Sequence, residues 1–230
     1  MRVVLFDIDG TILLTDGAGR RAMLGALEAT FGTAGDPTFR YDGKTDMQIV
    51  REAMRGAGHA DALIDERMPA VIDRYVGGLR RELESAPGTV QLMRGVTALL
   101  DAVAARDDMV LGLLTGNVVA GAEAKLTVAG VGFARFRLGA YGSDHEHRDA
   151  LPAIARERAA VLLGHDVAGE DLVIIGDTPS DIACGRGVGA RAVAVATGHY
   201  SVDELAGHAP AAVFRDLGDT AAVLRAIEER

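Results

Sequence analysis

The stretch Val3-Val4-Leu5-Phe6-Asp7-Ile8-Asp9-Gly10-Thr11, close to the start of the chain, decides the fold. Its first four residues form a continuous apolar run, which is typical of a short strand buried on both faces of a parallel sheet. Two aspartates follow this strand at its carboxyl end, where open α/β sheets bind their ligands. We expect the chain to curl after Asp7 so that both carboxylates face one reactant, and Gly10 permits such a turn.

Later apolar runs predict the remaining strands of the sheet. They lie at residues 109–114, 138–141, 172–175 and 192–196, with a possible edge strand at 211–214. The segments between these runs carry apolar residues at the spacing of a helix. Strands that alternate with helices favour a parallel sheet covered by helices on both faces. The sequence therefore predicts an α/β fold.

Residues 16–86 have a different pattern. They contain three amphipathic stretches with helical spacing, around residues 22–31, 47–54 and 63–83, and no convincing strand. Pro69 lies inside the third stretch, and we expect it to kink or split that helix. We therefore predict an all-helical cap of residues 16–86, inserted after the first strand, and a core made of residues 1–15 and 87–230.

Composition and charge narrow the possible functions. The 230 residues include 24 basic and 33 acidic side chains, and the net charge of −9 argues against a nucleic-acid partner, which needs a clustered positive field. No apolar stretch approaches the ~20 residues of a membrane-spanning helix, and the first residues do not resemble a signal peptide. A single cysteine fits a reducing compartment. We expect a cytoplasmic protein without a membrane partner, and we predict no particular oligomeric state.

Polar clusters follow two further predicted strands. Thr115-Gly116-Asn117 comes after one of them and offers a hydroxyl, a backbone amide and a side-chain amide, which can all hold phosphate oxygens. Gly176-Asp177-Thr178-Pro179-Ser180-Asp181 comes after another and adds two carboxylates. Carboxylates gathered at one crevice repel one another, so a hard cation such as Mg²⁺ is their natural companion. A turn-capping role would explain each cluster alone, but three clusters at three strand ends favour one shared site.

These three motifs resemble the first, second and fourth signature motifs of the haloacid dehalogenase superfamily, in the same order along the chain. The helical insertion resembles the C1 cap of the phosphoglycolate-phosphatase-like members of that family. The resemblance covers nearly the whole chain and implies a Rossmann-like core together with a helical cap. It also implies a Mg²⁺-dependent phosphatase that hydrolyses a small phosphorylated metabolite, phosphoglycolate-like or a sugar phosphate, through an aspartyl-phosphate intermediate.

The resemblance also implies roles for individual residues. Asp7 would be the nucleophile, and Asp9 would act first as the general acid and then as the general base. The direct ligands of Mg²⁺ would be Asp7, the backbone carbonyl of Asp9 and Asp177, with Asp181 supporting them from behind. The groups that hold the phosphoryl group would be the side chain of Thr115 and the amides of Gly116 and Asn117.

One motif of the family is altered in this sequence. The third motif usually holds a lysine followed by a proline, but the only two lysines of this chain, Lys44 and Lys125, do not have that context. Arg148 lies in the expected interval before the fourth motif. A guanidinium stays charged and can contact phosphate oxygens and carboxylates together. We therefore predict that Arg148, rather than Lys125, contacts the phosphoryl group.

The cap carries the residues that would select the substrate. In the resembling family, the cap loop at residues 41–46 faces the catalytic strand ends and helps to choose the substrate. We therefore predict Lys44 and Thr45 as substrate-selecting residues, and Arg20 is a weaker candidate. An alternative is that Thr45 or Asp46 simply caps the helix that follows.

Three other features have simpler explanations than a functional site. The run His145-Glu146-His147 has no distant His or Cys cluster to complete a metal site, so we expect a solvated loop. Residues 185–190 fit the pattern G-x-G-x-x-A, but they follow a predicted helix, and ending that helix explains them better than dinucleotide binding. Cys184 is expected to be packed and unreactive.

Other reactions of the resembling family remain as alternatives. Dehalogenation needs no acid at the position of Asp9, so the intact pair of aspartates disfavours it. A phosphomutase would differ from a hydrolase only in its cap, and phosphonate cleavage would use a cap lysine as a Schiff base, a role open to Lys44. A non-catalytic binding protein that keeps the fold is the alternative from another class, and the complete acidic motifs argue against it.

Overall fold

A parallel sheet of six strands forms the centre of the protein, in the order β5-β4-β1-β6-β7-β8. The computed structural model describes residues 1–229. Each strand of this sheet begins and ends within one residue of the predicted positions, which confirms the α/β fold class. The strands are β1 (Arg2–Phe6), β4 (Met109–Thr115), β5 (Leu138–Tyr141), β6 (Leu172–Gly176), β7 (Arg191–Val195) and β8 (Ala212–Phe214).

The order of the strands places a switch point at β1. Strands β4 and β6 flank β1, and Phe6 lies opposite both Leu113 and Ile175. From β1 the chain builds β4 and β5 on one side, and it then returns to build β6, β7 and β8 on the other side. A reversal of this kind leaves a crevice at the carboxyl ends of the central strands. The three polar motifs of the sequence follow these three neighbouring strands.

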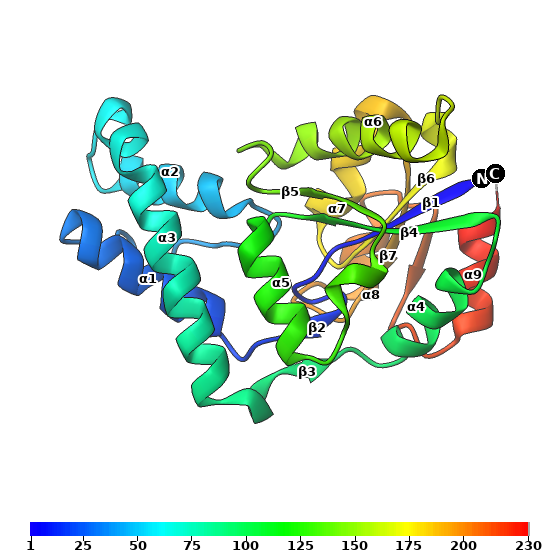
Figure 1. Ribbon diagram of the computed structural model, residues 1–230, viewed down its shortest axis with the longest axis horizontal. Helices are drawn as coiled ribbons and strands as arrows, with labels where there is room; N and C mark the ends of the chain where they lie inside the picture. Colours follow the sequence, from blue (N-terminus) through cyan, green and yellow to red (C-terminus); the bar gives the residue numbers. More distant parts are fainter. Residues whose placement is uncertain (230) are drawn as a thin grey trace.

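Helices cover both faces of the sheet because the strands are apolar on both faces (Figure 1). Val4 and Phe6 face one layer of helices, and Val3 and Leu5 face the other. The first layer consists of α4 (Val96–Ala104), α5 (Val119–Val128) and α9 (Thr220–Glu228). The second consists of α6 (Leu151–Leu163), α7 (Pro179–Cys184) and α8 (Val202–Ala206).

Three helices form the predicted cap at one end of the core, on the left in Figure 1. They are α1 (Ala18–Phe31), α2 (Asp46–Gly56) and α3 (Asp61–Ser85). Their buried faces share an apolar cluster that is separate from the clusters against the sheet and includes Leu27, Val50, Ile64 and Leu79. Residues 16–86 contain no strand, as the sequence predicts. The exact division into 16–86 and the two core segments stays a prediction.

Two very short strands link the cap to the core. Strand β2 (Leu13–Leu14) pairs antiparallel with β3 (Gln91–Leu92), so the chain leaves and re-enters the core at the same place. Two-residue strands leave no periodic signal, and the sequence analysis missed both. Short 3₁₀ turns complete the fold at Pro87–Thr89, Phe133–Arg135, Arg148–Ala150, Gly169–Asp171 and Gly185–Val188.

The last of these turns accounts for the glycine pattern after α7. Gly189 ends the turn with a φ of 74°, and the chain then enters β7. This geometry confirms that the glycines at residues 185–190 end a helical segment. Cys184 is buried, and burial raises the pKa of its thiol to about 12, as expected for a packed and unreactive cysteine.

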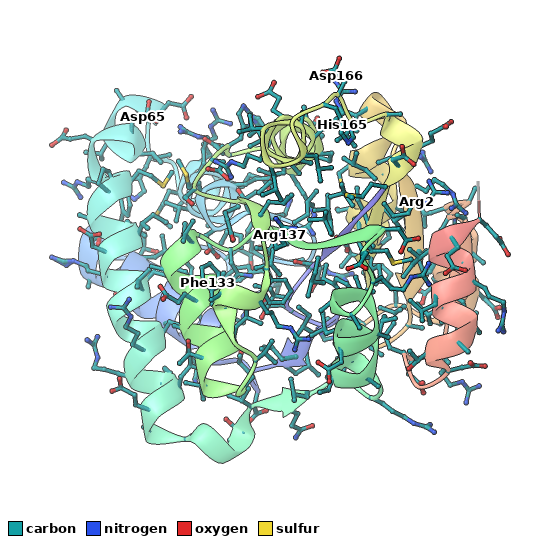
Figure 2. All side chains as sticks on the ribbon, turned by 45° about the vertical axis from the view of Figure 1, so that its right-hand side comes forward. Arg2, Asp65, Phe133, Arg137, His165 and Asp166 are labelled. Carbon is teal, nitrogen blue, oxygen red and sulfur yellow. The ribbon has the colours of Figure 1, made fainter. Side chains whose placement is uncertain are left out.

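The two ends of the chain lie side by side (Figure 1). The Arg2 guanidinium donates hydrogen bonds to the carbonyl oxygens of Glu228, at 3.0 Å, and Glu229, at 2.8 Å. Polar side chains project from the outer surface, for example His165 and Asp166 in the turn after α6 (Figure 2). No helix among residues 1–229 is both long enough and apolar enough to cross a membrane.

Helix α3 runs unbroken through Pro69, so the expected split does not occur. A proline in a helix leaves the carbonyl of the residue four positions earlier without its N–H donor. Here that residue is Asp65, and both Asp65 and Pro69 are exposed, so water can satisfy the carbonyl. The opposite face of α3 is held by buried Ile64, Met68 and Val71.

Replacing Pro69 with alanine is expected to stabilise the protein. The substitution restores a helical hydrogen bond and removes a clash, against a smaller loss because proline restricts the unfolded chain. We expect Pro69→Ala to raise the free energy of unfolding by about 1–2 kcal/mol in urea denaturation. A lower stability would show that the ring of Pro69 contributes packing that alanine cannot replace.

Candidate active site

Three core segments meet at the switch point, at the carboxyl ends of β1, β4 and β6, and the cap covers them. A cavity of about 860 Å³ lies between the core and the cap. Its lining includes Asp7, Asp9, Thr115 and Arg148 from the core, and Arg20 and Lys44 from the cap. The cavity therefore brings together residues that are far apart in the sequence.

The loop after β1 turns sharply, as the sequence predicts. The Asp7 amide still continues the sheet, because it donates to the carbonyl of Ile175 at 2.9 Å. The amides of Ile12 and Leu13 then both donate to the Ile8 carbonyl, which closes a tight turn. Gly10 has a φ of 80°, and a Cβ atom there would collide with the Asp177 carboxylate. Only glycine fits at this position.

A cluster of three buried carboxylates lies at the base of the cavity. Oxygen atoms of Asp7, Asp177 and Asp181 all lie within 4.8 Å of one another. Burial is the largest cause that raises the pKa of Asp7, to about 6, and the neighbouring carboxylates of Asp181 and Asp9 add to it while Arg148 opposes it. Burial and the carboxylates of Asp181 and Asp7 raise the pKa of Asp177 well above its usual value, while Thr11 and Arg148 oppose the shift. The cluster therefore carries more negative charge than its surroundings compensate.

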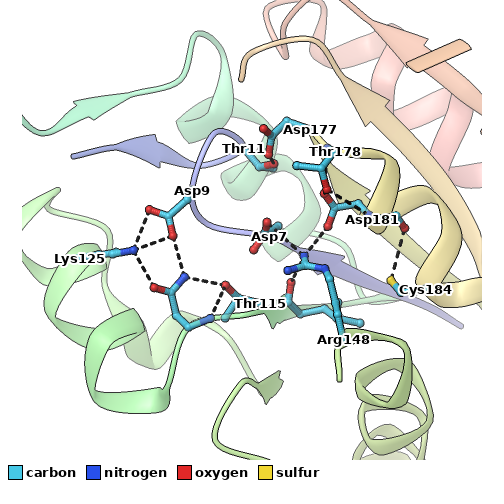
Figure 3. Close-up of polar contacts among 12 residues, drawn as sticks. Asp7, Asp9, Thr11, Thr115, Lys125, Arg148, Asp177, Thr178, Asp181 and Cys184 are labelled. Atoms are coloured by element: carbon cyan, nitrogen blue, oxygen red, sulfur yellow. Dashed lines mark hydrogen bonds and ion pairs between the residues drawn. The ribbon is translucent and has the colours of Figure 1, made fainter. Parts of the chain in front are cut away.

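Arg148 is the basic side chain that contacts this cluster. Its Nη2 lies 3.1 Å from an oxygen of Asp7 and also donates to Oδ1 of Asp181 (Figure 3). The other oxygen of Asp181 accepts hydrogen bonds from the amide of Thr178, at 2.9 Å, and from its hydroxyl, at 2.6 Å. The Arg148 Nε is buried and has no hydrogen-bond partner among the described residues. Arg148 thus lies where the sequence places the cation of the altered third motif.

The cluster fits a hard divalent cation. All its donors are carboxylate oxygens, which suit Mg²⁺ and not a soft metal. The oxygens of Asp181 are engaged by Arg148 and Thr178, whereas Asp177 accepts one hydrogen bond, from the Thr11 hydroxyl at 2.9 Å. The carboxylate of Asp177 therefore has fewer protein partners than that of Asp181 and is freer to bind a cation; the assignment of the direct ligands stays a prediction.

Asp9 turns away from this cluster and toward the opposite wall (Figure 3). Both of its carboxylate oxygens accept from the ammonium of Lys125, at 2.8 and 2.6 Å. The side-chain amide of Asn117 donates to Asp9 at 2.8 Å and to the Thr115 hydroxyl at 2.9 Å. The loop after β4 is therefore connected to Asp9 by hydrogen bonds.

Lys125 is a site residue whose contact with Asp9 the sequence analysis missed. It was considered only as an alternative to Arg148, whereas the structure places both cations at the cavity, on different aspartates. A signal was present in the sequence, since Lys125 shares one face of α5 with buried Gly121, Ala122 and Leu126. A lysine on the buried face of a helix needs an anionic partner.

The cap loop docks directly on the loop after β4. The amide of Asp46 donates to the Gly116 carbonyl at 2.8 Å, and the Asp46 carboxylate accepts from the Val118 amide at 2.8 Å. A Cβ atom on Gly116 would collide with the carbonyl of Lys44. The phosphate-binding loop predicted at residues 115–117 is therefore held in part by the cap.

The two predicted substrate-selecting residues of the cap have different surroundings. Lys44 lines the cavity, and its ammonium pairs with Glu52 at 2.8 Å. Thr45 is fully buried, and its hydroxyl accepts from the Gln48 amide at the start of α2 and donates to the Glu146 carbonyl. Thr45 thus has the helix-capping role that was the alternative for it.

The run His145-Glu146-His147 is only partly the solvated loop that we expected. The two histidines are exposed, but Glu146 accepts from the Arg51 Nε at 2.5 Å, and its side chain is 17% exposed. This ion pair joins the core to α2 of the cap, a contact between distant segments that the sequence pattern could not indicate. Among the described residues, the three-carboxylate cluster is the group that could hold a metal.

A comparison with protein families agrees with this arrangement. The family model described as HAD-hydrolase-like matches residues 150–220, which include β6 and α7 with Asp177 and Asp181. A comparison with curated proteins finds no match.

Solved structures resemble the chain over nearly its whole length. A hydrolase from Pseudomonas syringae is 18% identical, with a TM-score of 0.71 and 98% of both chains covered. A predicted phosphoglycolate phosphatase from Haemophilus somnus is 17% identical, with a TM-score of 0.68 over 97% of this chain and 98% of the other. A mutant of CbbY from Rhodobacter sphaeroides, in complex with xylulose-(1,5)-bisphosphate, is 21% identical, with a TM-score of 0.68 over 95% and 96%.

These similarities establish a shared fold. Together with the family match, they confirm the predicted resemblance to the haloacid dehalogenase superfamily.

Removing the cation of the carboxylate cluster is expected to destabilise the protein. Arg148→Ala would leave Asp7 and Asp181 buried without a charged partner, which should cost about 3 kcal/mol or more. The measurement is the free energy of unfolding in urea, with EDTA present. Arg158→Ala is the matched control, because Arg158 is 42% exposed and pairs with Asp144, so its loss should cost at most about 1 kcal/mol. Equal losses for the two variants would contradict the charge argument.

Proposed function

We propose that the protein is a Mg²⁺-dependent phosphatase that hydrolyses a small phosphorylated metabolite through a phosphorylated Asp7. The observation that carries the proposal is the placement of Asp7 and Asp9 around one covered cavity, with Arg148 on the first and Lys125 on the second. A nucleophile and a proton-transfer group that are held by different basic side chains suit a reaction in two displacements.

The first displacement forms a bond between an Asp7 oxygen and phosphorus. The bond from phosphorus to the leaving oxygen breaks, and Asp9 gives its proton to that oxygen. In the second displacement a water attacks phosphorus, its proton passes to Asp9, and the bond to Asp7 breaks with release of phosphate. The proton that Asp9 gives up in the first displacement is replaced in the second, so the protons balance over the cycle.

The chain's own groups supply most of the charge stabilisation. Arg148 and the loop at residues 115–117 would hold the phosphoryl oxygens in the cavity that the cap covers. The residues that would hold Mg²⁺ are Asp7, the backbone carbonyl of Asp9 and Asp177. When bound, this ion would neutralise the carboxylates and polarise the phosphoryl group.

The cavity supports a small substrate. Its volume of about 860 Å³ is in the range of small-molecule sites, ~300–1,000 Å³. Of the structures that share the fold, one is described as a predicted phosphoglycolate phosphatase and another holds xylulose-(1,5)-bisphosphate, which supports a phosphorylated metabolite for this chain also. Phosphonate cleavage is less well supported, because the candidate Lys44 is paired with Glu52. A cytoplasmic location stays a prediction.

The role of Asp7 can be tested with an isosteric change. Asp7→Asn removes the nucleophilic carboxylate but keeps the shape of the side chain, so the variant should fold and show no turnover of p-nitrophenyl phosphate. The matched control is Asp166→Asn, which changes an exposed aspartate far from the cavity and should keep full activity. Activity of Asp7→Asn within tenfold of the unaltered protein would rule out the proposed mechanism.

The metal is tested by its effect on stability. A ligand that binds only the folded state stabilises it, by about 2.7 kcal/mol at one hundred times its Kd. Mg²⁺ should therefore raise the Tm of the protein, and EDTA should reverse the rise. Asp177→Asn should lessen the rise, whereas Asp166→Asn should leave it unchanged. An unchanged Tm with Mg²⁺ and full activity in EDTA would refute the metal requirement.

A further inference from the structure

The ammonium of Lys125 pairs with Asp9, and none of the bond-making or proton-transfer steps proposed above involves it directly. Its side chain is 5% exposed, whereas that of its partner Asp9 is 43% exposed. Lys125 therefore supports Asp9 from the protein side, and the free surface of the Asp9 carboxylate faces the cavity.

The contacts of Lys125 fix the orientation of Asp9. The ammonium has three donors, and the structure gives it three acceptors at 2.6–2.8 Å, namely both oxygens of Asp9 and the side-chain oxygen of Asn117. The amide nitrogen of Asn117 also donates to Asp9. Asp9 is thus held at both oxygens by two side chains that are themselves hydrogen-bonded to each other. A carboxylate held in this way has little freedom to rotate.

The cap completes the surroundings of the ammonium. A Cβ atom on Gly19 of α1 would lie 3.6 Å from the Lys125 Nζ and 3.8 Å from the Tyr75 hydroxyl of α3. Two cap helices therefore lie near the Lys125 ammonium, on the side of the ion pair that is buried, and limit the access of water there. Exclusion of water strengthens an ion pair relative to one at an open surface.

We propose that Lys125 is a positioning residue that holds Asp9 for proton transfer at the leaving oxygen of the substrate. This inference rests on the proposed function, because it assigns a task within that reaction. Lys125 does not touch phosphorus or the leaving oxygen. It acts through Asp9, whose free surface in the cavity is where the leaving oxygen would lie.

A comparison of substrates with different leaving groups distinguishes this positioning role of Lys125 from a merely structural one. A phenolate with an acidic conjugate acid departs without a proton, whereas an alkoxide needs one. A misplaced Asp9 should therefore slow the hydrolysis of an alkyl phosphate much more than that of p-nitrophenyl phosphate. The quantity to measure is kcat/KM, because it reports the steps up to release of the leaving group and is independent of the second displacement.

The experiment compares Lys125→Met with the unaltered protein on p-nitrophenyl phosphate and on an alkyl phosphate monoester that the protein accepts. We expect kcat/KM to fall by about 10²-fold for the alkyl ester, the scale of a misplaced catalytic group, and by less than about tenfold for the aryl ester. Lys125→Gln keeps one N–H donor for Asp9 and should give an intermediate ratio. It also serves as the test variant if Lys125→Met does not fold.

The matched control is Glu123→Met, which introduces the same side chain on the exposed face of α5. It should change neither the two values of kcat/KM nor their ratio. Equal losses on both esters in Lys125→Met and Lys125→Gln would overturn the positioning role while leaving the proposed function intact. If the unaltered protein hydrolyses neither ester, the proposed function and this inference both fail.

Discussion

Negative charge that is buried at one point of the sheet is the constraint on which the rest of the structure depends. Asp7, Asp177 and Asp181 come within 4.8 Å of one another, in a place that excludes water. Isolated carboxylates would be neutralised by protonation in such surroundings, and the raised pKa values of Asp7 and Asp177 show this pressure. The buried guanidinium of Arg148, from a distant segment, offsets part of this charge, and the three carboxylates could also hold a metal ion.

The two basic side chains that contact the aspartates, Arg148 and Lys125, contact different ones. Arg148 approaches from the turn before α6 and contacts Asp7 and Asp181, whereas Lys125 approaches from α5 and contacts Asp9. Carboxylates two residues apart thus acquire different surroundings, one dry and crowded and one partly open to the cavity. Separate surroundings of this kind are how one protein gives chemically identical groups different tasks.

The cap participates in this arrangement and does not simply cover it. Asp46 bonds to the loop that carries Gly116 and Val118, and Arg51 reaches Glu146, two residues before Arg148. The loops that would hold the phosphoryl group therefore take part of their shape from the cap.

The sequence predicted the sheet, the helices and the acidic motifs well, because each leaves a local pattern. Strand β1 is visible in the sequence as an apolar run followed by Asp7 and Asp9. Because parallel strands bring their carboxyl ends to one edge of the sheet, the meeting of the acidic motifs could also be predicted. The pairing of Lys125 with Asp9 and of Arg51 with Glu146 was not predicted, since these pairs join residues about a hundred positions apart through packing alone. The sequence allowed two roles for Thr45, substrate selection and capping of α2, and the hydrogen bonds of its hydroxyl favour capping.

The antiparallel pair of β2 and β3 determines where a different cap could be inserted into this core. Leu13 pairs with Leu92, so the two ends of the helical insertion leave the core about one strand spacing apart, ~4.8 Å. An insertion of another length or shape needs only to start and finish at this ribbon, and the pairing of β1 with β4 does not change. Closing a longer loop between the same two points costs little extra entropy. The ribbon therefore makes the helical layer an exchangeable module, whose replacement must match the face of α5, the loop after β4 and the turn around Glu146.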